Sequence, residues 1–412
     1  MKRTLFILVL ISIFLLSACA PALPTAGPAT AIPVAASATL PAPSATPVPA
    51  ATATPMPAAT ATRVPPSPTP LPPTPTQKPV YLHLVVFGSD QTVQLVNTNI
   101  QVGSGYNPAF TGFLPAGGAT GGTAYVLNYN SPTKAQAVNA KGASDLGFIK
   151  DANYGLALWS RGPNTQPKLA WGTQLTDKAP SSLNISGLDG SNLETLFTLP
   201  AGQTPYMQLL AEGWSADGKT LYFSKEPFGI GGYILFDGAS NLYSIDVSTK
   251  KVTEIIPQST RMLCLDAISA DFSLVADHCT ANVITIRDLV KKTSSTIQPP
   301  AGLTSFQVMG SARFSPDGKR VAFALGKNDP SAEQGWVAVS DSLSGASKLI
   351  LTGKAAVSYT IIGWLDDSTL LVQSNAIQCD TTCTNQLWTV GTDGSNPVKV
   401  ADGSLLTVMD NR

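Results

Sequence analysis

The stretch FSPDGKRVAFAL, Phe314 to Leu325, decides the fold of this chain. An aromatic residue leads into Ser-Pro-Asp-Gly-Lys, and alternating apolar residues follow. Asp317 and Gly318 could belong to an active site, to a cation-binding loop or to a tight turn. Asp and Gly favour turns, and apolar alternation favours a half-buried strand. The stretch therefore predicts a hairpin.

Related stretches recur along the chain. A close match begins at Trp214, looser matches begin at Ile268 and Trp364, and a weak match begins at Trp159. Phe113 in GFLPAGG is taken as a sixth anchor. The anchors 159, 214, 268, 314 and 364 are separated by 55, 54, 46 and 50 residues. After each anchor the order is strand, loop, strand, polar turn, strand. A repeated four-stranded unit of roughly 50 residues predicts an all-β fold made of propeller blades.

The repeated motif resembles the WD40-like repeat of the TolB family, in which F-S-P-D-G-K precedes an apolar strand. The match is strong at 314–325 and 214–223, fair at 268 and 364, and weak before 160. The resemblance implies a β-propeller and a general habit of binding other macromolecules. TolB carries an α/β domain before its propeller, whereas this chain has a proline-rich segment there. The particular partners of TolB therefore do not carry over.

The number of blades follows from the anchors and the chain ends. Six anchors give six blades. The strand-like runs YLHLVVFG and TVQLVNTN near residue 80, joined to the C-terminal SLLTVMD, would make one composite closing blade. Such a blade links the two ends and removes an open sheet edge. Seven blades are favoured, and six is the alternative.

The N-terminus predicts export and lipidation. Lys2 and Arg3 precede an apolar run, and small residues then lead to Cys19. This order is typical of a signal peptide, and the ending Leu-Ser-Ala-Cys resembles the lipobox of bacterial lipoproteins. The resemblance implies cleavage after residue 18, acylation of Cys19 and attachment to a membrane through this lipid anchor. The chain would then lie outside the cytoplasm, on the periplasmic or cell-surface side. The alternative is an ordinary signal peptide with an incidental cysteine.

Composition divides the remaining chain in two. Residues 19–79 form a linker rich in Pro, Ala and Thr, because 18 of the 33 prolines lie in residues 20–79. Such a segment buries no core and is predicted to be a disordered spacer. Residues 80–412 form the predicted propeller, with 22 of the 26 cations and all 26 acids of the chain. No basic patch appears, so nucleic acid is not expected as a partner.

Four cysteines lie in the propeller region: Cys264, Cys279, Cys379 and Cys383. With a two-residue turn at Asp271 and Phe272, Cys264 would face Cys279 across a hairpin, within disulfide range. A longer turn would leave the two cysteines diagonal. Cys379 and Cys383 are expected to pair within a loop. A zinc site is the alternative, but no complete set of four ligands is visible, so no metal is expected.

The loops of the repeats differ in length. The first and third turns of each unit are short, whereas the second loops at 224–241, 325–335 and 374–386 are long. Binding residues are often placed on irregular loops of a rigid scaffold. We therefore expect the binding site on the long-loop face, with these candidate residues: Phe228, Tyr233, Phe236, Asp329 and Glu333.

No catalytic motif is visible, and the chain has only two histidines, so we predict that it is not an enzyme and uses no cofactor. The six tryptophans are expected between blades, although exposed aromatic residues could bind sugar. The predicted function is interaction of a monomeric propeller with an envelope protein or another macromolecule. The alternatives are a glycan- or solute-binding module and an enzyme that uses carboxylates in the central channel.

Overall fold

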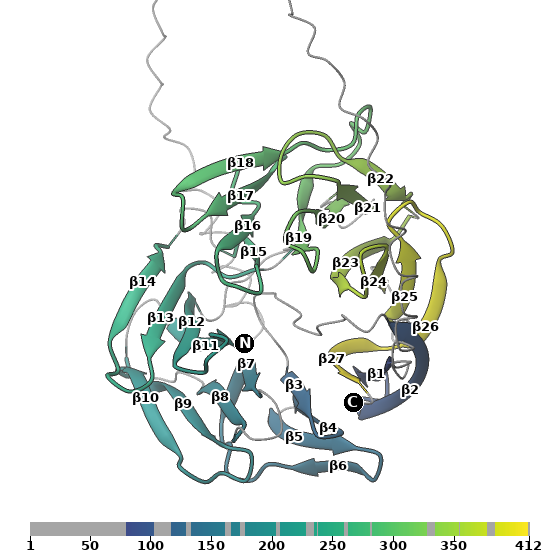
Figure 1. Cartoon of the computed structure of the whole chain (residues 1–412). Coiled ribbons are helices and arrows are strands. Elements are labelled where there is room, and N and C mark those ends of the chain that lie inside the picture. Colours follow the sequence, from purple (N-terminus) through teal and green to yellow (C-terminus); the bar gives the residue numbers. More distant parts are fainter. Residues whose placement is uncertain are drawn as a thin grey trace, which may run out of the picture. The chain divides into compact units, whose positions relative to one another are not determined.

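The structure is a computed structural model that describes residues 80–102, 117–128, 133–160, 166–173, 178–202, 207–227, 235–236, 238–258, 263–280, 282–327, 334–353, 355–376 and 384–410. These residues form 27 strands in seven antiparallel sheets. The sheets are arranged as blades around a common axis (Figure 1). The fold is a seven-bladed β-propeller.

Six blades have four described strands in simple order, listed here from the innermost strand to the outermost. Blade 1 contains β3 (Gly117–Thr120), β4 (Thr123–Asn128), β5 (Lys134–Asn139) and β6 (Gly142–Asp145). Blade 2 contains β7 (Ala152–Trp159), β8 (Lys168–Thr173), β9 (Ser181–Gly187) and β10 (Glu194–Leu199). Blade 3 contains β11 (Met207–Trp214), β12 (Thr220–Pro227), β13 (Leu242–Asp246) and β14 (Val252–Ile256).

The other three four-stranded blades follow the same order. Blade 4 contains β15 (Leu265–Ile268), β16 (Leu274–Asp277), β17 (Ile284–Asp288) and β18 (Thr293–Ile297). Blade 5 contains β19 (Val308–Phe314), β20 (Val321–Gly326), β21 (Gly335–Ser340) and β22 (Lys348–Leu351). Blade 6 contains β23 (Val357–Trp364), β24 (Thr369–Ala376), β25 (Gln386–Gly391) and β26 (Val398–Asp402).

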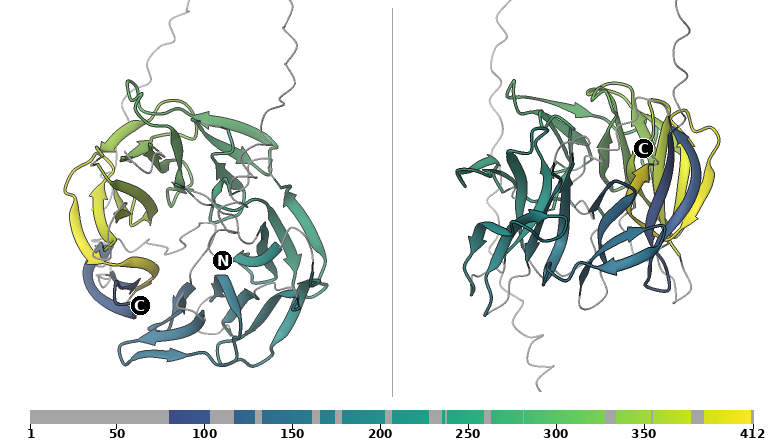
Figure 2. Two further views of the ribbon diagram at one scale, coloured as in Figure 1. Left: turned by 180° about the vertical axis from the view of Figure 1, so that it is seen from behind. Right: turned by 60° about the horizontal axis from the view of Figure 1, so that its bottom comes forward.

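Blade 7 joins the two ends of the propeller. Its described strands are β27 (Ser404–Asp410), β1 (Val80–Phe87) and β2 (Val93–Val102), with β1 in the middle. The views from two directions show these strands side by side (Figure 2). The register places His83 opposite Met409, and Val80 opposite Val102. The composite closing blade predicted from the sequence is confirmed, and seven blades are correct.

The anchor residues are the last residues of innermost strands. Trp159, Trp214, Ile268, Phe314 and Trp364 end β7, β11, β15, β19 and β23. Phe113 lies outside the described residues, and the inner strand of blade 1 ends at Thr120. The sixth anchor was therefore misplaced, because blade 1 has no aromatic residue at this position.

The hydrophobic core consists of seven clusters, each between two neighbouring blades. Strands inside a blade are covered on both faces by the neighbouring blades, so they read as continuous apolar runs. All six residues of β20 and all six of β21 are buried, for example. Four of the six tryptophans are buried as expected, namely Trp171, Trp214, Trp336 and Trp364.

Candidate functional site

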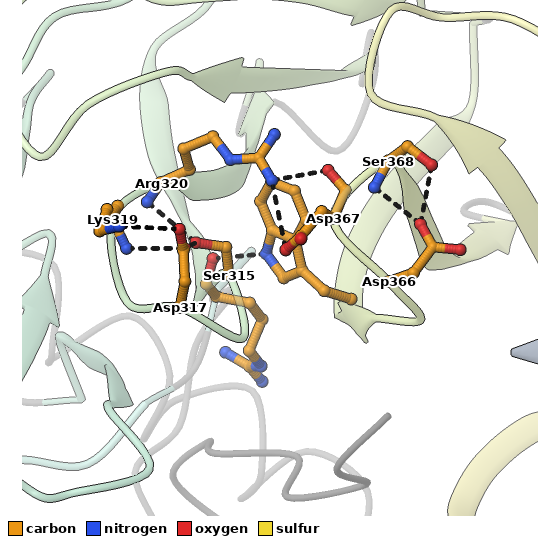
Figure 3. A network of polar contacts seen from close by, with 9 residues as sticks. Ser315, Asp317, Lys319, Arg320, Asp366, Asp367 and Ser368 are labelled. Atoms are coloured by element: carbon orange, nitrogen blue, oxygen red, sulfur yellow. Dashed lines mark hydrogen bonds and ion pairs between the residues drawn. The ribbon is translucent and has the colours of Figure 1, made fainter. Parts of the chain in front are cut away.

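The turn of the FSPDGK motif is held by its own side chains (Figure 3). The Ser315 hydroxyl donates to Asp317 Oδ1 at 2.6 Å and accepts from the Arg320 amide at 2.9 Å. The Lys319 amide also donates to Asp317 Oδ1, at 3.1 Å. The hydrogen bond from Ser315 lowers the pKa of Asp317. Because both turn side chains are engaged locally, the motif has a structural role.

Two further turns repeat this geometry. Ser215 with Asp217, and Ser269 with Asp271, make the same hydroxyl-to-carboxylate contact, each at 2.7 Å. The fourth residue of the turn has positive φ, 67° at Gly218 but 57° at Phe272. Left-handed backbone is costly for a residue as large as Phe. The Phe272 ring stacks on Tyr222 of blade 3 with centroids 3.7 Å apart, which compensates for this cost.

Replacing Asp317 with alanine is expected to lower the free energy of unfolding by about 1 kcal/mol, because the Ser315 hydroxyl and the Lys319 amide each lose an acceptor. Chemical denaturation measures this change. Asp317→Asn keeps an acceptor oxygen and should lose less than half as much. Equal losses in both variants would show that the charge, and not the turn geometry, matters.

The turn of blade 5 also contacts the next blade (Figure 3). Arg320 donates to the Asp367 carbonyl oxygen at 2.6 Å, and its guanidinium lies 4.8 Å from the centre of the Trp364 ring. The Trp364 indole N–H in turn donates to the Arg313 carbonyl oxygen at 3.1 Å. The same contact joins Trp214 to the Ala157 carbonyl oxygen at 3.3 Å. Anchor tryptophans therefore fasten each of these blades to the one before it.

Polar side chains at bulges of the inner strands form a second set of inter-blade contacts. In β15 the register shifts at Asp266, whose side chain is fully buried. Its Oδ1 accepts from the Ser311 amide of blade 5 at 3.0 Å, and its Oδ2 lies 3.0 Å from His278 Nδ1. Arg313 donates to the Asp266 carbonyl oxygen at 2.8 Å, and burial lowers the pKa of Arg313. This cluster of buried Asp266 and His278 with half-buried Arg313 links blades 4 and 5.

Two carboxylates of blade 3 are also buried. Glu212 and Glu226 expose only 5% and 2% of their surface. Ser224 Oγ donates to Glu212 Oε1 at 2.6 Å, and the Ser240 amide donates to Glu226 Oε1 at 2.8 Å. Burial raises the pKa of Glu226 to about 7. Blade 3 thus holds these two carboxylic side chains, but neither faces solvent.

The structure contains the disulfide between Cys264 and Cys279, with Cα atoms 5.0 Å apart. The geometry around it differs from the expected one. The hairpin turn has four residues: the Ser269 amide donates to the Leu274 carbonyl oxygen, and the Leu274 amide donates to the Ser269 hydroxyl, each at 2.9 Å. Next to the turn the strands pair in the expected register, with Ile268 opposite Val275. The bulge at Asp266 then shifts the pairing of the two strands by one residue, so Cys264 lies opposite His278 and not opposite Cys279. The two cysteines are therefore diagonal.

Most of the other predicted site residues lie outside the described residues: Cys19, Phe228, Tyr233, Asp329, Glu333, Cys379 and Cys383. Phe236 is described, and only 7% of its surface is exposed. It packs in the hydrophobic cluster between blades 5 and 6. Its ring is therefore a packing element, which corrects its assignment to an exposed binding face. A long loop offers aromatic rings to the protein core as readily as to a partner.

A groove of about 520 Å³ lies between blades 6 and 7. Its lining residues come from β2, from the first turn of blade 6 and from the strands that follow it: Asn97, Thr98, Ile100, Gln101, Leu365, Asp366, Thr369, Thr389, Val398 and Val400. Val398 is 54% exposed. Asp366 Oδ1 is held at 2.7 Å by the Ser368 amide (Figure 3).

This groove lies beside short turns, at the end of the propeller opposite to the face that loop lengths favour. Sequence reasoning missed it because the groove combines the Trp364 repeat with strand β2, about 260 to 300 positions away in the chain. The predicted closing blade was the one sequence feature that could have pointed to this groove. A junction between the two chain ends breaks the regular repeat and leaves a differently shaped interface.

Comparisons with known proteins assign neither a family nor an activity to this chain. No family model matches the chain, and no curated protein matches it. Solved structures do match, including a putative TolB from Agrobacterium tumefaciens, at 13% identity and TM-score 0.35, covering 79% of this chain and 90% of that one. A periplasmic gluconolactonase from Pseudomonas aeruginosa matches at 12% identity and TM-score 0.44, covering 81% and 99%.

The tricorn protease matches at 12% identity and TM-score 0.44, covering 76% of this chain, which spans 33% of the protease chain. The prediction that the chain is not an enzyme is corrected by these findings, because propellers named as a protease and a lactonase are among the matches. At such low identity they assign no activity to this chain.

The described residues bear on two further questions. They contain no group of three or more His, Cys, Asp or Glu side chains placed to hold a metal ion. They also contain no helix with the length and hydrophobicity needed to cross a membrane.

Proposed function

We propose that this chain is a lipid-anchored extracytoplasmic protein whose propeller binds another protein through the groove between blades 6 and 7. The leader with Cys19 and the proline-rich segment before residue 80 support the anchoring. The groove is the observation that carries the binding function. It combines an exposed aliphatic side chain with several hydrogen-bonding groups on a rigid, closed scaffold.

The chemistry of the lining favours a polypeptide. The described lining residues offer amide and hydroxyl groups from Asn97, Gln101, Thr369 and Thr389, beside Ile, Leu and Val side chains. Such a mixture suits the main-chain polar groups and small apolar side chains of a peptide. Sugars are usually held against aromatic rings, and these lining residues include none. They also include no cation, which disfavours an anionic ligand.

The lipid anchor is tested by metabolic labelling. Cells that express the full chain and receive an alkyne-bearing fatty acid should incorporate the label, and Cys19→Ser should abolish it and release the protein from the membrane fraction. Label that persists in Cys19→Ser would contradict acylation at this residue. Cys264→Ser serves as the control, because it removes a different cysteine from the chain.

The groove is tested by photo-crosslinking in intact cells. A benzoylphenylalanine placed at Val398 should give a discrete crosslinked protein adduct. The matched control is the same probe at Val290, which is 75% exposed but lies in blade 4. The same adduct from both positions, or none from Val398, would contradict the groove assignment. A glycan or solute ligand would instead raise the melting temperature of purified protein without giving a protein adduct.

A further inference from the structure

The loop that follows β12 contains a segment that runs to neighbouring blades. We call its described residues, 235–236 and 238–241, the strap. Ala239 exchanges two backbone hydrogen bonds with Leu265 of blade 4, at 2.9 and 2.8 Å, and the Gly238 amide donates to the Leu263 carbonyl oxygen at 3.1 Å. The strap therefore continues the sheet of blade 4 from a loop that belongs to blade 3.

The first end of the strap reaches blade 5. Phe236 and Leu235 fill a notch formed by two glycines of that blade. A Cβ atom on Gly310 would lie 2.7 Å from Phe236 Cβ, and one on Gly326 would lie 1.9 Å from Leu235 Cδ2. Such distances mean that a side chain at either glycine would require Phe236 or Leu235 to move. The notch is shaped to receive the strap.

The other end of the strap rests on Glu226. The Ser240 amide donates to Glu226 Oε1 at 2.8 Å, and Asn241 exchanges hydrogen bonds with the backbone of Lys225 at 2.8 and 2.6 Å. The second carboxyl oxygen, Oε2, is buried and has no hydrogen-bond partner among the described residues. A buried oxygen without a partner is costly, and far more so when it carries charge.

We propose that Glu226 is a proton-controlled latch: its neutral acid holds the strap on blades 4 and 5, and loss of its proton to solvent releases the strap. The inference goes beyond the proposed binding function and does not depend on it. Release lets water reach the carboxylate, and it also vacates the notch at Gly310 and Gly326. The latch would thus uncover the two glycines of blade 5 in response to pH.

The surroundings of Glu226 favour this behaviour. The adjacent strand β11 carries one acidic residue, Glu212, whose Oε1 accepts from the Ser224 hydroxyl at 2.6 Å. On the blade 4 side, Asp266 and His278 contact each other. The described residues of the strap carry no titratable side chain, and Asp237, between its two parts in the sequence, lies outside the described residues. The Lys225 ammonium lies 4.2 Å from the centre of the Tyr243 ring.

The size of the effect follows from linkage. Burial raises the pKa of Glu226 from 4.5 to about 7 while the strap is closed. If the released strap restores the ordinary value, the opening equilibrium rises about tenfold per pH unit across this window, and about 300-fold in total.

Hydrogen–deuterium exchange of the full chain tests the latch. Protection factors for the amides of residues 238–241, corrected for the intrinsic pH dependence of exchange, should fall steeply from pH 5 to pH 7.5 in the wild type. Glu226→Gln keeps an acceptor for the Ser240 amide but cannot ionise, so its protection should stay constant. Phe236→Ala should weaken protection at every pH and keep the pH dependence.

Amides of β21 report global unfolding and should stay protected throughout. The proposal is overturned if strap protection in the wild type does not change with pH. It is also overturned if Glu226→Gln shows the same fall, or if β21 loses protection together with the strap.

Discussion

Replacing Trp364 with alanine is expected to lower the free energy of unfolding by about 4 kcal/mol. The side chain is only 5% exposed and packs in the hydrophobic cluster between blades 5 and 6. Its removal leaves a cavity at an interface that holds two blades in register. It also removes the cation–π contact with the Arg320 guanidinium and the indole N–H that donates to the Arg313 carbonyl oxygen. Chemical denaturation of both proteins at neutral pH measures the loss.

Trp364→Phe separates packing from hydrogen bonding. Phenylalanine fills most of the space but cannot donate, so the Arg313 carbonyl oxygen loses its partner and stability should fall by about 1 to 2 kcal/mol. A loss below 1 kcal/mol for the alanine variant would contradict a role for the anchor tryptophan in joining blades. Equal losses for both variants would assign the whole effect to the hydrogen bond.

Repetition made the fold predictable from the sequence. Five anchors spaced 46 to 55 residues apart mark the ends of five inner strands, because blades 2 to 6 each place a large apolar side chain there against a neighbouring blade. The closing blade was predictable for a different reason. The runs at the two ends of the propeller are apolar and strand-like, and their pairing removes an exposed sheet edge.

Features that depend on contacts between distant residues were not predictable. The bulge at Asp266, which moves Cys264 out of line with Cys279, depends on contacts to Ser311 and His278 that no local pattern signals. Phe236 looked like a binding residue because it lies in a long loop. Its burial follows from two glycines of blade 5, and nothing in the sequence relates those glycines to that loop.

The free energy of unfolding of Glu226→Gln, minus that of the wild type, is expected to rise by about 3 kcal/mol between pH 4.5 and pH 7.5. The folded state raises the pKa of Glu226 from 4.5 to about 7 because the side chain is buried. Between these values the folded protein keeps a proton that the unfolded chain releases. The stabilisation is complete below pH 4.5 and is lost as pH rises through 7. Glutamine stays neutral, so it does not show this loss.

The measurement is urea denaturation of both proteins at several pH values, and the quantity of interest is their difference. Other ionisable groups cancel in this difference, as does any constant cost of burying the glutamine amide. Glu194→Gln is the matched control, because Glu194 is 44% exposed and its substitution should give no comparable trend with pH. A flat difference for Glu226→Gln would contradict the raised pKa. A difference that rises but levels off well below about 3 kcal/mol would mean that the carboxylate becomes hydrated without global unfolding. That plateau would measure the free energy of releasing the strap. Once ionising the buried carboxylate costs more than opening the strap, the folded protein opens the strap and hydrates Glu226.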